Sequence, residues 1–250
     1  MAPIVMTKSA FYPSLIAIFF ALSCNTSYKA ENLHYSNYRI QQSFVESKLL
    51  TPIIKPYSDS INKLMNVVVG YNESQLEKKR QQNTLGFFMT DAFLEMARRK
   101  VDAKVDAAFM NSGGIRLPDL PVGAVTQGKV YELMPFDNLM VLLKVKGSLL
   151  KEYLDTLAVN DGIIESGMTM QIVNKIAQQV MVGGKPLDLN ADYIIAHSDY
   201  VASNSNLLKG LHRNTNGYLL RDAILDYIKL NHSIGKKIMV NHPDRISYVN

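Results

Sequence analysis

Two short segments in the middle of the 250-residue chain hold residue types suited to binding a small molecule. The first begins at Asn111, continues through Gly113 and Gly114, and ends at Arg116. Paired glycines permit positive φ and let backbone N–H groups approach a ligand closely. An arginine offers a planar fork of donors to a carboxylate or a phosphate. The same pattern also fits a plain turn at the end of a strand, followed by an arginine on the surface.

The second segment, residues 135–138, places Phe136 and Asn138 just before an apolar run. An aromatic ring held next to a proline offers a flat face on which a base can stack, at roughly 1–3 kcal/mol per stacked base. An asparagine side chain both donates and accepts hydrogen bonds, which suits a heterocycle edge or a ribose. The spacing of Phe136 fits a plug in the hydrophobic core equally well.

The surrounding pattern predicts the elements that position these segments. The clearest helix covers residues 84–100, with apolar residues at helical spacing and cations in its last turn. Residues 139–145 read as a central strand, followed by a helix that Ser148 caps. Further elements are predicted as strands at 66–70, 105–110, 169–176, 178–182, 193–196, 237–240 and 245–249, as helices at 46–65 (broken by Pro52 and Pro56) and 217–230, and as a loop at 199–206.

Some of these strands are joined through helices and others through tight turns. We therefore expect an α/β fold of the α+β type, a compact layered domain with mixed β-sheets flanked by helices. The interior shows no repeat, no low-complexity linker and no shift in composition, so one domain over residues 35–250 is predicted.

Residues 1–23 show the pattern of a signal peptide. Lys8 precedes an apolar stretch, residues 11–22, that is shorter than the roughly 20 residues needed to span a bilayer. Residues 21–24 resemble a bacterial lipobox, in which the cysteine is lipidated, although Ala21 stands in place of the usual leucine. An ordinary cleaved signal with an incidental cysteine is the alternative.

The lipoprotein interpretation implies lipidation at Cys24, a polar tether over residues 24–34, and a lipid-anchored protein in the bacterial cell envelope, facing the periplasm or the outer membrane. Cys24 is the only cysteine, so the chain has no internal disulfide and no cysteine-based metal cluster. The formal net charge of +5 suits an anionic small molecule and is too weak to indicate a nucleic-acid partner.

Taken in order, several motifs together resemble the C-terminal domain of the bacterial and animal 5′-nucleotidase family. They keep their order and spacing over about residues 60–250. The motifs are Thr84-Leu85-Gly86 followed by Asp91-Ala92, the N-x-G-G-x-R at 111–116, the V-Y-x-x-x-P-F-x-N at 130–138, the K-G-S-x-L at 146–150, Ser166-Gly167, and Ser198-Asp199-Tyr200.

This resemblance implies a nucleotide-specificity domain in which two aromatic rings sandwich the base. Phe136 and Tyr200 would supply the two rings, Arg116 would face the anionic or ribose side, and Asn138 would face the base edge. The substrate-binding residues predicted in this way are Asn111, Gly113, Gly114, Arg116, Phe136, Asn138, Tyr200 and Asn206.

Two departures from the family pattern concern the ribose side of this site. The family loop after the second aromatic carries G-G-D, whereas residues 204–206 here read Asn-Ser-Asn. Asn206 can still form hydrogen bonds, but the charge is gone. Where the family often has an arginine followed by a glutamate, this chain has Lys79 and Gln82, and a lysine lacks the bidentate fork.

Hydrolysis in that family belongs to a separate metallophosphoesterase domain with two metal ions, and its motifs D-x-H, G-D-x-x-D, G-N-H-E and G-H-x-H are absent from this sequence. We therefore expect no cofactor in this chain, and divalent metals only on a partner metallophosphoesterase. The chain would bind a nucleotide or nucleoside for that partner in nucleotide catabolism. The alternatives are a hydrolase active by itself, and a surface or structural lipoprotein with a degenerate site.

Overall fold

The computed structural model describes residues 36, 47–160, 162–240, 242 and 244–249. Residues Lys48–Asn250 form one compact unit. The predicted signal peptide, the tether with Cys24 and the predicted beginning of the domain at residue 35 lie outside the described residues. In the described part, no helix is both long enough and apolar enough to cross a membrane.

A five-stranded mixed sheet carries the segments predicted to bind a ligand. β11 runs parallel to β3 and antiparallel to β6, while β7 runs antiparallel to β3. Every residue of β3 is buried, and β6 and β11 each contain four consecutive buried residues, so this sheet passes through the hydrophobic core. The strand order is β12 (Arg213–Asn214), β6 (Met140–Lys146), β11 (Asp192–Ser198), β3 (Ala107–Phe109) and β7 (Glu165–Ser166).

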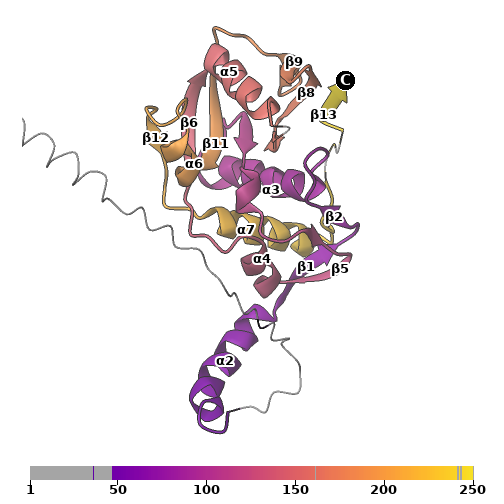
Figure 1. The fold of residues 1–250 in the computed structure, drawn as a ribbon, viewed down its shortest axis with the longest axis vertical. Helices are drawn as coiled ribbons and strands as arrows, with labels where there is room; N and C mark the ends of the chain where they lie inside the picture. Colours follow the sequence, from indigo (N-terminus) through magenta and orange to yellow (C-terminus); the bar gives the residue numbers. More distant parts are fainter. Residues whose placement is uncertain (1–35, 37–46, 161, 241, 243, 250) are drawn as a thin grey trace, which may run out of the picture. The chain divides into compact units, whose positions relative to one another are not determined.

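The second sheet is also mixed, because β13 runs parallel to β8 while the other pairs are antiparallel. Its order is β10 (Lys185–Pro186), β9 (Ile176–Val182), β8 (Met168–Val173) and β13 (Ile246–Val249). Two antiparallel pairs accompany it: β1 (Val68–Asn72) with β5 (Gly123–Thr126), and β2 (Leu76–Glu77) with β4 (Asp119–Leu120). Helices flank these sheets (Figure 1), which confirms the predicted fold class.

Helix α3 (Thr84–Lys100) lies in the middle of the hydrophobic core (Figure 1), with the bounds that the sequence predicted. The Asn83 side chain caps it by accepting a hydrogen bond from the Gly86 N–H at 2.8 Å. Residues 85–97 are buried all round the helix except at Glu95, so α3 has neighbours on nearly every side. It packs against α7 (Leu220–Ser233) and against β3 and β7.

Helix α2 (Thr51–Met65) corrects the prediction that the prolines break this segment. Pro52 lies in the first turn, where a backbone donor has no helical partner in any case. Pro56 removes one further donor, yet the helix continues through it to Met65. None of the residues of α2 is buried.

Helix α5 (Gly147–Ala158) begins without the predicted cap, since no side chain caps it and Ser148 is its second residue. The first amides are satisfied by backbone instead: Gly147 N–H donates to Ala191 O and Ser148 N–H donates to Leu189 O, each at 2.9 Å. This segment approaches so closely that a Cβ on Gly147 would lie 2.0 Å from the Asp188 carbonyl oxygen. Only glycine fits there without a shift of the backbone.

Candidate functional site

The three predicted parts of the site leave the five-stranded sheet at one edge. Because β11 runs parallel to β3, the chain leaves both strands in the same direction, toward Tyr200 and Asn111 respectively. β6 runs antiparallel to β11, with Met140 opposite Ser198, so the residues just before β6 lie at that edge as well. The topology therefore brings Asn111, Asn138 and Tyr200 to a common edge.

The turn after β3 uses its glycines for close packing. Neither Gly113 nor Gly114 has a positive φ, so that part of the prediction is wrong. A Cβ on Gly113 would lie 3.1 Å from Asn111 Nδ2, and one on Gly114 would lie 3.2 Å from Met110 Cε. The Asn111 side chain therefore lies close to a short 3₁₀ turn, η2 (Ser112–Gly114), and a side chain at Gly113 or Gly114 would require its neighbours to shift slightly.

Arg116 and Phe136 lie together. The Arg116 N–H donates to the carbonyl oxygen of Leu133 at 2.9 Å, which places Arg116 beside the end of helix α4 (Gln127–Leu133). Its guanidinium carbon lies 5.6 Å from the centre of the Phe136 ring, within the range of a cation–π contact. Arg116 is exposed, and no carboxylate among the described residues forms an ion pair with it.

Phe136 lies at the border of the hydrophobic core. The ring is partly buried and packs against the core cluster, yet it is not closed off from solvent. The loop around it is held by Arg221, which donates to the Phe136 carbonyl at 3.2 Å and to Asp137 at 2.5 Å. Arg221 also lies over the Tyr131 ring, 4.3 Å from its centre.

Arg221 is a site-supporting residue that sequence reasoning missed. It is nearly buried, at 8% exposure, and it lies in the first turn of α7. A cation is unfavourable at that end of a helix because it faces the positive pole of the helix dipole. That mismatch is the one signal in the sequence that points to a tertiary role for Arg221.

Tyr200 lies on a short helix, α6 (Asp199–Asn204), where a loop was predicted. Ser198 caps the helix by accepting from Val201 N–H at 3.1 Å, and Asp199 adds a carboxylate to its first turn. Asp199 Oδ1 accepts from both Tyr200 N–H and Leu139 N–H, at 2.8 and 3.1 Å. Tyr200 is 58% exposed, and its backbone is fixed next to the residue that follows Asn138.

Asn206 lies just beyond α6 and is exposed. Its Oδ1 accepts from Lys209 Nζ at 3.2 Å, so its hydrogen-bonding capacity is partly used within its own loop. Arg213 holds this loop by donating to Ser203 Oγ and to the Ala202 carbonyl. No hydrogen bond between described residues joins Asn206 to Arg116, Phe136 or Asn138, so its place in a ligand site stays a prediction.

A buried aromatic cluster lies under the edge of the sheet. His197 stacks on Phe109, and Tyr153 packs edge-on against both rings. His197 Nδ1 accepts from Ser198 N–H at 2.8 Å, so the proton is assigned to Nε2, which then donates to Tyr153 Oη at 2.8 Å. Burial lowers the pKa of His197 to about 3 and raises the pKa of Tyr153. The imidazole is therefore neutral and supports the segment that carries Tyr200.

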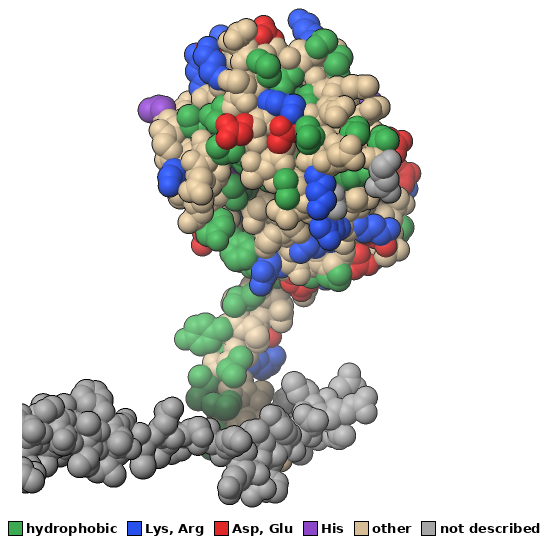
Figure 2. All heavy atoms as spheres, turned by 45° about the horizontal axis from the view of Figure 1, so that its top comes forward, with side chains coloured by type: hydrophobic (Ala, Val, Ile, Leu, Met, Phe, Trp, Pro, Cys, Tyr) green, Lys and Arg blue, Asp and Glu red, His purple; other side chains and the backbone are tan. Residues whose placement is uncertain are grey.

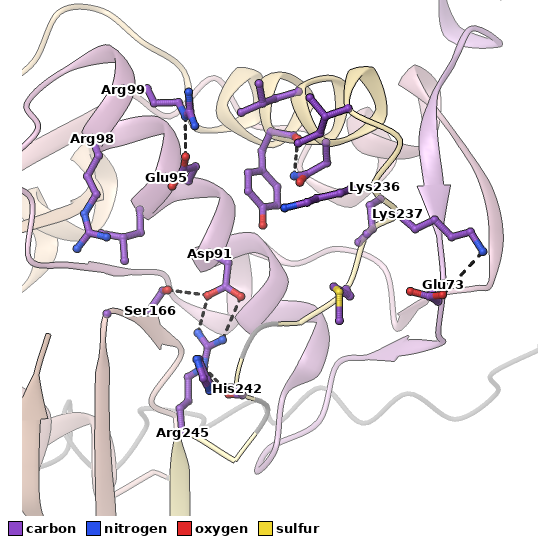
Figure 3. A pocket seen from close by; sticks show the side chains of 18 of the residues that line it. Glu73, Asp91, Glu95, Arg98, Arg99, Ser166, Lys236, Lys237, His242 and Arg245 are labelled. Atoms are coloured by element: carbon purple, nitrogen blue, oxygen red, sulfur yellow. Dashed lines mark hydrogen bonds and ion pairs between the residues drawn. The ribbon is translucent and has the colours of Figure 1, made fainter. Parts of the chain in front are cut away.

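A cavity of about 1190 Å³ lies between α3, α7 and the segment after α7 (Figure 3), and none of the predicted site residues lines it. Both carboxylate oxygens of Asp91 accept from the Arg245 guanidinium there, at 2.8 and 3.0 Å. Ser166 Oγ donates to Asp91 at 2.6 Å. These bonds tie α3 to the segment just before β13.

The described residues contain no group of three or more His, Cys, Asp or Glu side chains arranged to hold a metal ion. The described side chains therefore do not provide the ligand cluster that a pair of catalytic metal ions would need.

Comparison with known proteins agrees with the sequence motifs. Residues 61–211 match the family described as 5′-nucleotidase, C-terminal domain. The 5′-nucleotidase of Vibrio parahaemolyticus is 28% identical over 174 residues, covering 66% of this chain and 30% of its own length. Protein UshA of Yersinia enterocolitica is 28% identical over 214 residues, covering 82% of this chain and 36% of its own length.

A solved structure, the 5′-nucleotidase precursor of Thermus thermophilus, shares the fold with a TM-score of 0.68 at 25% identity. The likeness covers 81% of this chain and 43% of the Thermus chain. The present chain thus spans about a third of the length of its curated relatives and about two fifths of this solved one.

Proposed function

Because the chain belongs to the family of 5′-nucleotidase C-terminal domains, we propose that it binds a nucleotide or nucleoside at the edge of its five-stranded sheet. The observation that carries the proposal is the convergence of three segments at that edge, with Phe136 and Tyr200 on two of them. Arg116, in contact with Phe136, adds a permanent positive charge. Aromatic faces beside a cation suit a base attached to an anionic group.

In the proposed arrangement Phe136 and Tyr200 stack on the base, and Asn138 bonds its edge. The exposed guanidinium of Arg116 binds the ribose or phosphate side. Asn111, Gly113 and Gly114 line the same proposed site. Asn206 takes the place of the family's acid toward the ribose, with weaker hydrogen bonding because it carries no charge.

The proposal assigns hydrolysis to a separate metallophosphoesterase chain. Its support is the absence of the family's metal motifs from these 250 residues. The two chains would together act in nucleotide catabolism. We propose further that lipidated Cys24 holds the chain in the bacterial cell envelope. Labelling cells with an alkyne fatty acid tests this: the wild-type chain should carry the label, and the Cys24→Ser variant should not.

Calorimetric titration of the protein with adenosine and with AMP tests the binding proposal. Phe136→Ala and Tyr200→Ala are each expected to weaken binding at least tenfold. Tyr57→Ala, which removes another exposed tyrosine, is the matched control and is expected to bind as well as the wild type. Absence of binding at millimolar ligand contradicts the proposal and favours a surface lipoprotein with a degenerate site.

Phosphate release from AMP distinguishes the remaining alternative. The chain alone, supplied with Mg²⁺, Mn²⁺ or Zn²⁺, is expected to release no phosphate. Metal-dependent release that persists after repurification, and that Phe136→Ala reduces, would show a hydrolase active by itself.

A further inference from the structure

Helix α2 exposes an unusually apolar face. Five large side chains of this helix, each more than half exposed, lie on it: Ile53, Ile54, Tyr57, Ile61 and Leu64. Figure 2 shows hydrophobic side chains gathered on this helix. Exposed apolar patches of this kind on a water-soluble surface mark sites of interaction. We call these five side chains the apolar face of α2.

The spacing within the apolar face fits another helix or a helix-binding groove. Ile54, Tyr57, Ile61 and Leu64 follow one another at intervals of three, four and three residues, which is the a/d repeat of a helix–helix seam. The opposite side carries polar residues, among them Asn62 and the ion pair of Lys55 with Asp59 at 3.1 Å. The helix is thus amphipathic, and none of its residues on either side is buried by the part of the chain that the structure describes.

The comparisons show that α2 belongs to the shared fold. Residues 66–250 are 185 of the 250 residues, about 74% of the chain, whereas the likeness to the Thermus 5′-nucleotidase covers 81%. That likeness therefore extends into α2, and the family match begins within α2, at residue 61. The matched domain is described as C-terminal, so the larger, unmatched part of these relatives adjoins the domain at α2.

The end of α2 is fixed next to the candidate site. The Gln127 N–H, at the start of α4, donates to the Val67 carbonyl at 2.8 Å, just after α2 ends. A Cβ on Gly128 would lie 3.0 Å from the Met65 carbonyl oxygen, so the two helices are in close contact there. The other end of α4 leads into the loop that carries Phe136. A protein seated on α2 is therefore one short helix away from the proposed base-binding ring.

We propose that the apolar face of α2 is the docking surface for the separate metallophosphoesterase chain. This inference rests on the proposed function. The partner would cover the face with an apolar groove or an amphipathic helix of its own. Docking there would bring its catalytic metal ions to the edge of the sheet where the nucleotide is bound.

Site-specific photocrosslinking in the native cells tests which protein contacts the apolar face of α2. A benzoylphenylalanine is placed at Tyr57 on the apolar face, or at Asn62 on the opposite side as the matched control, and the crosslinked protein is identified by mass spectrometry. We expect position 57 to capture a protein that carries the metallophosphoesterase motifs, and position 62 to capture none. Capture at position 57 of a second copy of this chain, of lipid alone, or of no protein overturns the proposal.

A pair of variants then measures the contact with the protein so identified. Ile61→Glu is expected to weaken the complex at least tenfold and to reduce AMP hydrolysis by the two chains together to a similar extent. Asn62→Glu should change the affinity and the hydrolysis rate by less than twofold each. Equal effects of both substitutions, or none, overturn the proposal. Adenosine binding by the isolated chain should be the same in both variants. If the wild-type chain binds adenosine but does not dock, this inference alone is refuted; if it docks but binds no nucleoside, the binding proposal alone is refuted.

Discussion

Asp199 and Leu139 are joined by two reciprocal hydrogen bonds. The Asp199 N–H donates to the Leu139 carbonyl at 3.0 Å, and the Asp199 carboxylate accepts from the Leu139 N–H at 3.1 Å. One of these residues precedes Tyr200 and the other follows Asn138, so the pair fixes the two parts of the candidate site to each other. The same carboxylate oxygen also accepts from the Tyr200 N–H.

Replacing Asp199 should therefore affect ligand binding through position. Asp199→Ala leaves two backbone donors without their acceptor, and we expect it to lower the free energy of unfolding by about 1–3 kcal/mol and to weaken adenosine binding about fivefold. Asp199→Asn keeps an oxygen in place and should restore most of both. Urea unfolding and calorimetry measure the two quantities. Equal binding by wild type and Asp199→Ala would contradict the positioning role.

Arg116 should discriminate between a nucleotide and a nucleoside. Arg116→Met removes the charge and keeps a side chain that can pack on Phe136, so we expect the affinity for AMP to fall about tenfold, or about 1.4 kcal/mol. The affinity for adenosine should change less than twofold. Because exposed charges are screened by salt, the AMP effect should shrink between 50 and 500 mM NaCl. Equal losses for both ligands would place Arg116 at the base instead.

The sequence predicted helices well where several local features agreed. Helix α3 has apolar residues at helical spacing and cations in its last turn, and its bounds agree with the prediction. Helix α6 was missed, although Ser198 and Asp199 are helix-start residues, because six residues are too few for a periodic signal. The prediction that Phe136 and Tyr200 share one site came from the family resemblance. Spacing alone could not decide whether Phe136 stacks on a ligand or fills the core.

Long-range ion pairs were outside the reach of sequence reasoning. Arg245 pairs with Asp91 across 154 residues, and Arg221 pairs with Asp137 across 84, so no window of sequence contains both partners. Gly113 and Gly114 lack the positive φ that the sequence suggested, and a Cβ on either would lie close to Asn111 or Met110. Which property of a glycine is used depends on neighbours that only the fold brings near.

The buried pair of Asp91 and Arg245 should be a major contributor to stability. Their side chains are 6% and 4% exposed, so Asp91→Asn removes a charge that faces a buried guanidinium. We expect Asp91→Asn to lower the free energy of unfolding by about 3–5 kcal/mol. The exposed pair of Lys55 and Asp59 is the matched control, and Asp59→Asn should cost less than about 1 kcal/mol. Similar losses in urea unfolding would contradict this assignment.

Gly147 should tolerate no side chain. A Cβ there would overlap the Asp188 carbonyl oxygen, so we expect Gly147→Ala to shift the start of α5 and to lower the free energy of unfolding by about 1–3 kcal/mol. A Cβ on Gly210 meets nothing within 4 Å, and its φ is not positive. Gly210→Ala should therefore be neutral, or stabilising by up to about 1 kcal/mol. Equal thermal shifts for the two variants would show that the overlap is relieved without cost.

The stability of the protein should fall between pH 6.5 and pH 8 because of Glu165. Burial raises the pKa of this carboxyl to about 8, and its Oε1 has no hydrogen-bond partner among the described residues. The folded state therefore holds a proton that the unfolded state releases above about pH 4.5. The resulting stabilisation is complete below that pH and is lost as the pH rises to about 8, at roughly 1.4 kcal/mol per pH unit.

The buried His197 makes stability rise with pH below about pH 6.5, opposite to the effect of Glu165. The test is therefore made between pH 6.5 and pH 8. Burial lowers its pKa to about 3, so its contribution is lost as the pH falls below about 6.5 and the two slopes oppose one another there. Above pH 6.5 the opposing slope of His197 fades, and the slope of Glu165 amounts to about 2 kcal/mol by pH 8. Glu165→Gln, which is neutral at every pH, should abolish that decline in urea unfolding. An unchanged decline in the variant would mean that Glu165 is already ionised in the folded protein.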